Sequence, residues 1–353
     1  MDGSEKKKKK KKRSKDTDYV VPTVGSRFAA EFQKTKLSDL KRHATLGVGT
    51  FSRVNLVEHK RTGKTYALKR MEKRTIEQLK QKTHIMNEKK ILEEMDHPFI
   101  IQLHATFKDK GCLYMVTELV LGGELFSVLT REEYLDEKMT QFYCGCVVLG
   151  MEALHAKDNI YRDLKPENIL LDTDGYVKIC DFGFAKKVPG GDRTHTTCGT
   201  PEYVSPEMLN ASGHGKPTDW WCVGILIYEC LFATTPFAAE DYSETYEMIN
   251  RYAAGKDSID YACDGVKITK PARTLMQGLL HPNPDQRLGP TACRKHAWFQ
   301  KMDWGKLEGK QVQAPWLPEV KDERDATQFE GEDYGDDKPV KPYTGEGGWY
   351  DEF

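Results

Sequence analysis

The chain has 353 residues, of which 39% are hydrophobic and 30% are charged, which fits a soluble globular protein with room for two lobes. Its nine cysteines include no C-x-x-C pair, which excludes a zinc site of that kind and indicates reduced thiols in the cytoplasm or the nucleus. The net charge of −1 conceals two oppositely charged ends, with a net +7 over residues 1–15 and a net −8 over residues 319–353.

Residues 1–26 are predicted to form a disordered basic tail. Its lysine run, Lys6–Arg13, stands where a secretory signal would need apolar residues, and Asp2 excludes N-myristoylation. The run either binds an anionic membrane or nucleic acid or is a solvated tail, and the sequence leaves these alternatives open. No transmembrane segment is expected, because the most apolar stretch, residues 220–237, contains Glu229 and Pro236 and is predicted to be a buried helix.

The pattern of apolar residues then predicts a helical extension over residues 27–39, followed by strands and later mainly by helices. The predicted strands cover residues 45–49, 53–59, 65–71, 99–107 and 112–119, with one helix over 75–95 between them. The predicted helices beyond residue 123 cover 124–130, 137–157, 217–233, 241–254 and 270–280, with short strands at 169–172 and 176–179. We therefore expect an α+β fold with a strand-rich small lobe (40–120), a mainly helical large lobe (121–299) and a C-terminal tail (300–353).

A glycine-rich segment, residues 46–54, lies between the first two strands of the small lobe. Gly47 and Gly49 would let backbone amides approach phosphates without a Cβ clash, while Ser52 stands where a third glycine is usual. A strand follows the segment, which argues against a dinucleotide-binding loop because such a loop opens a helix. Taken alone, the segment fits a plain β-turn equally well.

Lys69 lies on the next predicted strand, and Glu88 lies on the helix that follows it. A lysine on an apolar strand is most often simply solvent-exposed. Here the helix could bring the Glu88 carboxylate to Lys69 and hold the lysine against nucleotide phosphates.

The segment Tyr161–Asn168 carries the strongest chemical signal. Phosphoryl transfer needs a carboxylate to accept the hydroxyl proton, a cation near the moving phosphate and an oxygen ligand for a metal. Asp163, Lys165 and Asn168 supply these three groups within six residues. Asp181 follows thirteen residues after Asn168 in an Asp-Phe-Gly triplet, where it could bind magnesium. The glycine-rich segment, Lys69, the loop 161–168 and the Asp-Phe-Gly triplet follow one another in the chain, and chance does not account for all four in this order.

These motifs resemble those of eukaryotic protein kinases over about residues 40–299. Within that superfamily the chain is similar to the AGC group, and most of all to the catalytic parts of cyclic-nucleotide-dependent kinases. The residues that carry the resemblance also include His97-Pro98-Phe99, Cys198 to Tyr203, Asp219-Trp220-Trp221 and the terminal Tyr350 to Phe353. The resemblance implies a bilobal serine/threonine kinase that uses ATP and Mg²⁺.

The resemblance also implies roles for individual residues. Asp163 would be the catalytic base, Lys165 would neutralise the γ-phosphate, and Thr200 would bridge the two. Asn168 and Asp181 would hold magnesium, while Lys69, oriented by Glu88, would bind the α- and β-phosphates. The ATP pocket would be completed by Leu46, Gly47, Gly49, Ser52, Val54, Thr117, Glu118 and Val120. Glu207 would pair with Arg287, and Asp219 would brace the catalytic-loop backbone.

Regulation and substrate choice follow from the same resemblance. Thr196 would be the activating phosphosite, with Arg162, Lys186 and His84 as the cations that bind its phosphate. The substrate-binding carboxylates would be Glu124, Glu167 and Glu229. They imply substrates with arginine or lysine at positions −3 and −2 before the phosphorylated serine or threonine.

The aromatic residues of the acidic tail imply that it is more than solvated chain. By resemblance, Tyr350 and Phe353 would fill a groove beside the Glu88 helix, and residues 329–334 would pass the nucleotide. No segment resembles a cyclic-nucleotide-binding domain, so such control would come from a separate regulatory subunit. The alternative function is a kinase-fold scaffold, a pseudokinase whose basic tail binds anionic partners.

Overall fold

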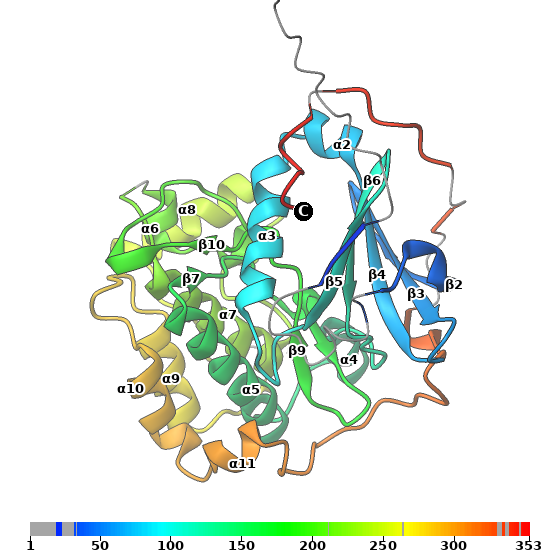
Figure 1. The fold of residues 1–353 in the computed structure, drawn as a ribbon. Helices are drawn as coiled ribbons and strands as arrows, with labels where there is room; N and C mark the ends of the chain where they lie inside the picture. The colour runs from blue at the N-terminus through cyan, green and yellow to red at the C-terminus, as the bar shows by residue number, and fades with distance from the viewer. Residues whose placement is uncertain are drawn as a thin grey trace, which may run out of the picture.

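A computed structural model describes residues 19–22, 32, 34–210, 212–262, 265–329, 334–335, 339–345 and 347–353. The chain forms two lobes (Figure 1). The sheet and helix α3 make up the small lobe, and a helical bundle makes up the large one. The predicted α+β class is confirmed.

The small lobe is built on one antiparallel sheet with the strand order β1-β5-β6-β4-β3-β2. Its strands are β1 (Tyr19–Pro22), β2 (Leu40–Val48), β3 (Ser52–His59), β4 (Thr65–Glu72), β5 (Leu103–Lys108) and β6 (Cys112–Thr117). In this register Lys69 of β4 stands opposite Val54 on one side and Met115 on the other. The lysine therefore lies in the middle of the sheet, directly beside the turn that joins β2 to β3.

Strand β1 is a departure from the predicted disordered tail. Its residues pair with β5, from Tyr19 opposite Lys108 to Pro22 opposite Ala105. The sequence Tyr-Val-Val favours extended backbone, and the edge of β5 offers unpaired backbone groups. The disorder prediction is therefore wrong for residues 19–22, while the rest of the tail lies outside the described residues. Of the predicted helical extension over 27–39, residues 27–31 and 33 lie outside the described residues, and a 3₁₀ turn, η1, covers Leu37–Asp39.

The single helix predicted over residues 75–95 is wrong, because two helices are present. These are α2 (Lys73–Gln78) and α3 (Lys82–Glu94). Lys80 between them has φ 56°, a left-handed conformation that ends a helix. Ile76 and Ile85 are both buried, so the apolar periodicity continues across the break and conceals it.

The large lobe surrounds two long helices, α5 (Glu137–Ala156) and α7 (Lys216–Phe232), which are almost entirely buried. Around them lie α4 (Leu125–Glu132), α6 (Pro206–Leu209), α8 (Tyr242–Ala253), α9 (Lys270–Leu279), α10 (Pro290–Lys295) and α11 (Trp304–Glu308). Two short strand pairs, β7 (Asn159–Ile160) with β10 (Lys186–Lys187) and β8 (Ile169–Leu171) with β9 (Val177–Ile179), face the small lobe. Among the described residues, no helix has both the length and the apolar character needed to cross a membrane.

Two buried polar contacts fix the large lobe. Glu207 and Arg287 form the predicted ion pair at 2.7 Å, with the arginine side chain fully buried. Asp219 accepts hydrogen bonds from the backbone amides of Tyr161 (2.9 Å) and Arg162 (2.8 Å). Both predictions are confirmed, and the second contact connects helix α7 directly to the catalytic loop.

The tail leaves the large lobe and returns to the small one (Figure 1). Tyr334 donates to the carbonyl of Leu46 at 3.3 Å, which places the tail beside the glycine-rich turn. At the end of the chain, the ammonium of Lys73 lies 3.8 Å from the Tyr350 ring centroid, and Phe353 is only 1% exposed. The prediction that the terminal aromatic residues pack beside the Glu88 helix is confirmed.

Replacing Phe353 with alanine should lower the free energy of unfolding by about 3 kcal/mol, because it leaves a cavity beneath helices α2 and α3. Asp351→Ala, two residues away on an exposed side chain, serves as the matched control. Denaturant unfolding of both variants measures the difference. Equal stability of the two variants would show that the terminal ring contributes nothing to the small lobe.

Candidate active site

The catalytic loop, residues 161–168, is held rigidly from below by Asp219. Within the loop, the Asn168 amide nitrogen donates to the Asp163 carbonyl at 2.8 Å and to its carboxylate at 2.7 Å. The Thr200 hydroxyl donates to the other carboxylate oxygen at 3.4 Å. The carboxylate of Asp163 is therefore held by two other predicted residues, Asn168 and Thr200.

Asp163 lies in an environment that disfavours its charge. Burial, with a smaller contribution from the nearby carboxylate of Asp181, raises its pKa to about 6. Lys165 and the hydrogen bonds from Asn168 and Thr200 act in the opposite direction but are outweighed. A carboxylate with such a pKa is a stronger base than an ordinary aspartate and is still ionised at neutral pH.

Lys69 and Glu88 form an ion pair of 2.6 Å between strand β4 and helix α3. Burial alone lowers the pKa of Lys69, but the carboxylates of Glu88 and Asp181 raise it to a net value above normal, so the lysine stays cationic. Asp181 lies 3.9 Å from the same ammonium. Among the described atoms, the second Glu88 oxygen is buried without a hydrogen-bond partner.

The cleft between the lobes encloses a cavity of about 550 Å³. Its lining includes all nine of the predicted nucleotide-binding residues, namely Leu46, Gly47, Gly49, Ser52, Val54, Lys69, Thr117, Glu118 and Val120. Phe329, the first residue of the tail segment predicted to pass the nucleotide, also lines it, whereas sequence reasoning missed Ala67, Met115 and Leu170. Ala67 is two residues before Lys69 on the same strand, so the alternation of β4 was the available signal.

Two oxygen-bearing side chains stand at the inner end of this cavity. The Asn168 amide nitrogen is committed to Asp163, which leaves its oxygen available to a metal. Asp181 has a left-handed backbone (φ 52°) and a side chain that is 55% exposed toward the cleft. These two oxygen donors fit Mg²⁺, which takes few protein ligands and completes its shell with phosphate and water.

Each predicted ligand of a phosphate on Thr196 contacts a group other than the Thr196 hydroxyl in the structure. Lys186 donates to the Thr194 hydroxyl at 2.9 Å, and Arg162 donates to the backbone carbonyl of Thr196 at 3.4 Å. His84 lies 2.6 Å from Gln81. The three predicted ligands of the phosphate therefore do not converge on the Thr196 hydroxyl, and burial together with the nearby Arg162 lowers the pKa of His84.

The three predicted substrate-binding carboxylates come from different elements. Glu124 precedes helix α4, Glu167 lies in the 3₁₀ turn η2 (Pro166–Asn168), and Glu229 lies in α7. Glu124 and Glu167 line the cleft cavity. Burial raises the pKa of Glu229 to about 7, although the Tyr203 hydroxyl donates to it. Tyr203 was not predicted as a partner, and its place in the sequence gave no sign of the contact.

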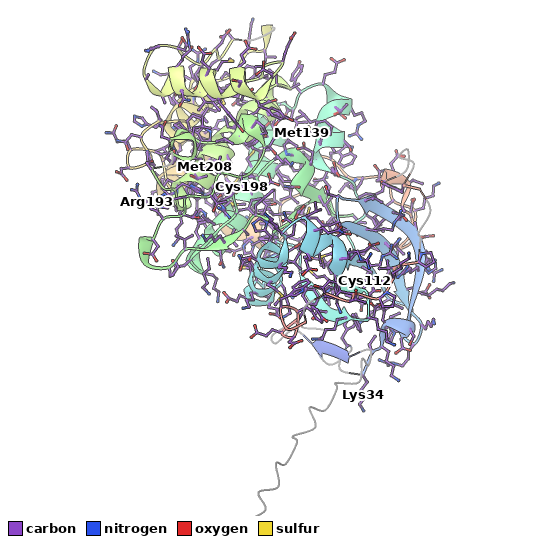
Figure 2. All side chains as sticks on the ribbon, turned by 90° about the horizontal axis from the view of Figure 1, so that it is seen from above. Lys34, Cys112, Met139, Arg193, Cys198 and Met208 are labelled. Atoms are coloured by element: carbon purple, nitrogen blue, oxygen red, sulfur yellow. The ribbon has the colours of Figure 1, made fainter. Side chains whose placement is uncertain are left out.

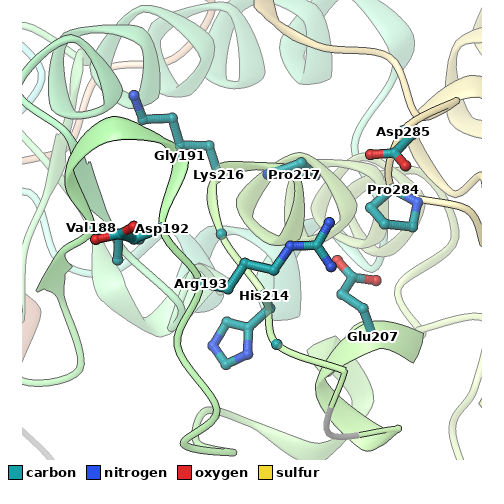
Figure 3. Close-up of a pocket in the computed structure, with 12 residues that line it drawn as sticks. Val188, Gly191, Asp192, Arg193, Glu207, His214, Lys216, Pro217, Pro284 and Asp285 are labelled. Carbon is teal, nitrogen blue, oxygen red and sulfur yellow. The ribbon is translucent and has the colours of Figure 1, made fainter.

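A smaller cavity of about 210 Å³ lies behind the activation segment (Figure 3). It is lined by Arg193, His214 and Lys216 among others, and it includes none of the predicted nucleotide-binding residues. The backbones of Thr194 and His214 exchange two hydrogen bonds beside it, of 3.0 and 2.9 Å. This contact fixes the activation segment to the large lobe.

Comparison with known proteins agrees with the cleft geometry. The family model described as "Protein kinase domain" matches residues 40–299, so the chain belongs to the protein kinase family. The predicted resemblance to cyclic-nucleotide-dependent kinases is also confirmed.

Three relatives illustrate this similarity. The chain is 41% identical over 324 residues to the cGMP-dependent protein kinase egl-4 of Caenorhabditis briggsae, covering 90% of this chain and 43% of the relative. It is 42% identical over 329 residues to a cGMP-dependent protein kinase, isozyme 2, of Drosophila melanogaster, covering 92% and 34%. It is 38% identical over 316 residues to the cAMP-dependent protein kinase catalytic subunit of Dictyostelium discoideum, covering 88% and 47%. The chain thus spans less than half the length of these relatives.

The raised pKa of Asp163 predicts the pH dependence of any reaction that uses it as a base. The protonated carboxyl cannot accept a proton, so kcat/KM should fall about tenfold per pH unit below a midpoint near pH 6. A pH profile of peptide phosphorylation, with the melting temperature followed in parallel, measures this midpoint. A midpoint near pH 4 with the fold intact would contradict the role of burial.

Proposed function

We propose that this chain is a serine/threonine protein kinase of cyclic-nucleotide signalling that transfers the γ-phosphate of ATP to basic protein substrates. The observation that carries the proposal is the convergence of Lys69, Asn168 and Asp181 on one cleft, with Asp163 hydrogen-bonded to Asn168 and the Lys69–Glu88 ion pair closed at 2.6 Å. The relatives bearing the names of cGMP- and cAMP-dependent kinases support the signalling context.

ATP is the phosphate donor in this proposal. Leu46, Val54 and Val120 would enclose the adenine ring, and the backbone of residues 118–120 would hydrogen-bond to its edge. Gly47 has no neighbouring atom within 4 Å of a Cβ position, which suits close approach of the phosphates. Lys69 would bind the α- and β-phosphates. Mg²⁺ would be held by Asn168 and Asp181 and would neutralise charge on the phosphates.

Asp163 and Lys165 act on the reacting groups. The oxygen of the substrate hydroxyl bonds to the γ-phosphorus while the Asp163 carboxylate accepts the hydroxyl proton. ADP departs with the bridging oxygen. Lys165 lies three residues before Asn168, where its ammonium can neutralise the transferred phosphate. Thr200, which hydrogen-bonds to Asp163, keeps the carboxylate oriented and is typical of kinases that act on serine and threonine.

The carboxylates of Glu124, Glu167 and Glu229 would select substrates with arginine or lysine at positions −3 and −2. Glu124 and Glu167 line the cleft, and Glu167 lies close enough to Glu229 to help raise its pKa, which supports this role. A substrate guanidinium bound beside Glu229 would also lower the raised pKa of that carboxyl. Substrate binding and ionisation of Glu229 therefore favour one another.

Thr196 would be the activating phosphosite. It is exposed, and the Arg162 guanidinium already donates to its backbone carbonyl at 3.4 Å. A phosphate on Thr196 would supply the anion that Arg162, Lys186 and His84 lack, and His84 on α3 would then connect the activation segment to the helix of Glu88. A separate cyclic-nucleotide-binding subunit would provide the regulation that the relatives' names indicate.

The alternative is a pseudokinase that acts only as a scaffold. Such a protein commonly lacks one of the groups that bind phosphate or metal, whereas Lys69, Asp163, Asn168 and Asp181 are all present and assembled here. The cleft therefore favours catalysis.

Asp163→Asn should lower turnover of an arginine-containing peptide by about 10³-fold, because it removes the base. ATP affinity should change little, since Lys69 and both proposed metal ligands remain. Radiolabelled phosphate transfer and nucleotide titration give the two readouts. If the variant and the parent phosphorylate the peptide at similar rates, the catalytic assignment is wrong; if the parent itself is inactive after Thr196 phosphorylation, the scaffold alternative holds.

Glu124→Gln should raise KM by about tenfold for a peptide with arginine at −3 and −2, because a charge-assisted hydrogen bond is lost. The same variant should leave KM unchanged for a peptide with alanine at these positions. Glu240→Gln, an exposed carboxylate elsewhere on the large lobe, is the matched control. An equal change for both peptides would show that Glu124 does not read the basic residues.

A further inference from the structure

A short linker, residues 118–123, joins strand β6 of the small lobe to helix α4 of the large lobe. In Figure 2 the Cys112 label marks the start of β6 in the small lobe, and the Met139 label marks α5 in the large lobe. Glu118 is the first residue of the linker, and both Glu118 and Val120 line the nucleotide cavity. The proposed contacts of adenine with the linker backbone therefore require that this segment keeps a fixed position.

The carboxylate of Glu118 is held by two donors that come from different parts of the chain. The backbone amide of Gln102 donates to its Oε1 atom at 2.8 Å, and the ammonium of Lys178 donates to the same oxygen at 2.8 Å. The Glu118 amide in turn donates to the Gln102 carbonyl at 3.0 Å. Both the backbone and the side chain of Glu118 are therefore fixed, so the linker begins from a defined conformation.

Lys178 lies on β9, between the fully buried residues Val177 and Ile179. Because side chains alternate along a strand, the Lys178 side chain lies on the opposite face from these two neighbours. It stands opposite Leu170 of β8 in the strand register, and Leu170 lines the nucleotide cavity. The ion pair with Glu118 therefore connects the linker to the strand pair that also supplies a residue of the cavity wall.

The other end of the linker is attached to the same strand pair. The Gly122 amide donates to the Leu171 carbonyl at 2.8 Å, and the Leu171 amide donates to the Gly123 carbonyl at 2.8 Å. Backbone hydrogen bonds to β8 thus hold residues 122 and 123. At residue 118, the attachment to this strand pair is made by the Lys178 side chain.

The surroundings of the Lys178–Glu118 pair make its charges depend on each other. The lysine side chain is only 8% exposed and that of Glu118 is 24% exposed, so water screens the pair weakly. Burial and the charge of Lys178 lower the pKa of His97 to about 4, so this neighbouring ring is uncharged at neutral pH. Among the described residues, Glu118 is the only carboxylate that forms an ion pair with Lys178. Loss of either partner would leave the other charge poorly solvated.

We propose that Lys178 is a positioning residue for ATP, which acts through Glu118 to hold the linker backbone where it meets the adenine edge. Lys178 is not among the described residues that line the nucleotide cavity, so its effect on ATP passes through Glu118. A linker held in one conformation has less freedom to lose when ATP binds, which strengthens binding. The inference rests on the proposed kinase function and deepens it, because it identifies a residue that sets the affinity for the phosphate donor.

The test measures ATP binding by the full chain and the kinetic constants with an arginine-containing peptide. Lys178→Met removes the charge but keeps an unbranched side chain, and Lys178→Arg keeps the charge. Lys310→Met is the matched control. The Lys310 ammonium lies 3.2 Å from Asp172 and 3.1 Å from Asp174 in the turn between β8 and β9, so it supports the same strand pair without contacting Glu118.

Lys178→Met should raise both the Kd and the KM for ATP about tenfold, which is the effect of losing one hydrogen bond. Its kcat at saturating ATP should stay within about twofold of the parent value, because the groups that act on the γ-phosphate are untouched. The Kd for inorganic tripolyphosphate, which has no adenine, should not change. Lys178→Arg and the control should bind ATP within about threefold of the parent, because each keeps a cation beside Glu118.

Equal losses of ATP affinity in Lys178→Met and Lys310→Met would reduce the effect to stability of the strand pair and overturn the proposal. Parental ATP affinity in an active Lys178→Met variant would overturn it while leaving the proposed function intact. Absence of ATP binding by the parent would contradict the proposed function, and the inference with it.

A double variant covers the case in which Lys178→Met does not fold. Lys178→Met combined with Glu118→Gln leaves neither charge unpaired, so this chain should fold. It should show the same loss of ATP affinity, about tenfold, because the ion pair acts as a unit. Parental affinity in the folded double variant would also overturn the proposal.

Discussion

The Lys69–Glu88 ion pair is the contact on which the active arrangement depends. It joins strand β4 to helix α3 at 2.6 Å inside the cleft, and both side chains are largely removed from water. Burying two charges is costly unless each compensates the other, so the pair forms only when helix and sheet are correctly placed. The tail reinforces this placement, since Phe353 packs in the same hydrophobic cluster as Ile85 of α3.

A second fixed point lies in the large lobe, where Asp219 holds the catalytic loop through two backbone amides. Arg162 has φ 69°, a conformation that a non-glycine residue adopts at some cost. The buried Asp219 carboxylate offsets that cost and fixes the loop in which Asp163 contacts Asn168 of the cleft lining. The Lys69–Glu88 ion pair in the small lobe and the Asp219 hydrogen bonds in the large lobe thus position the two sides of the same cleft.

Much of this arrangement was predictable from the sequence. The catalytic loop could be predicted because phosphoryl transfer needs Asp163, Lys165 and Asn168 at close spacing. The break between α2 and α3 could not, because the apolar pattern runs through it and only the backbone of Lys80 reveals it. Likewise, Tyr-Val-Val at residues 19–21 favours a strand, but only the free edge of β5 supplies a partner. The contact of Lys186 with Thr194 depends on the path of the activation segment, which local sequence does not encode.

Thr117 has a consequence for pharmacology. It lies at the end of β6, opposite Ala67 of β4 and Leu103 of β5, and it lines the 550 Å³ cavity. Methionine at this position would fill the space behind the adenine ring with its longer side chain. A compound that extends an aromatic group past Thr117 would therefore be accepted here and sterically refused by a kinase with methionine in its place. The difference of one side chain offers a route to selective inhibition within a family whose ATP sites are otherwise alike.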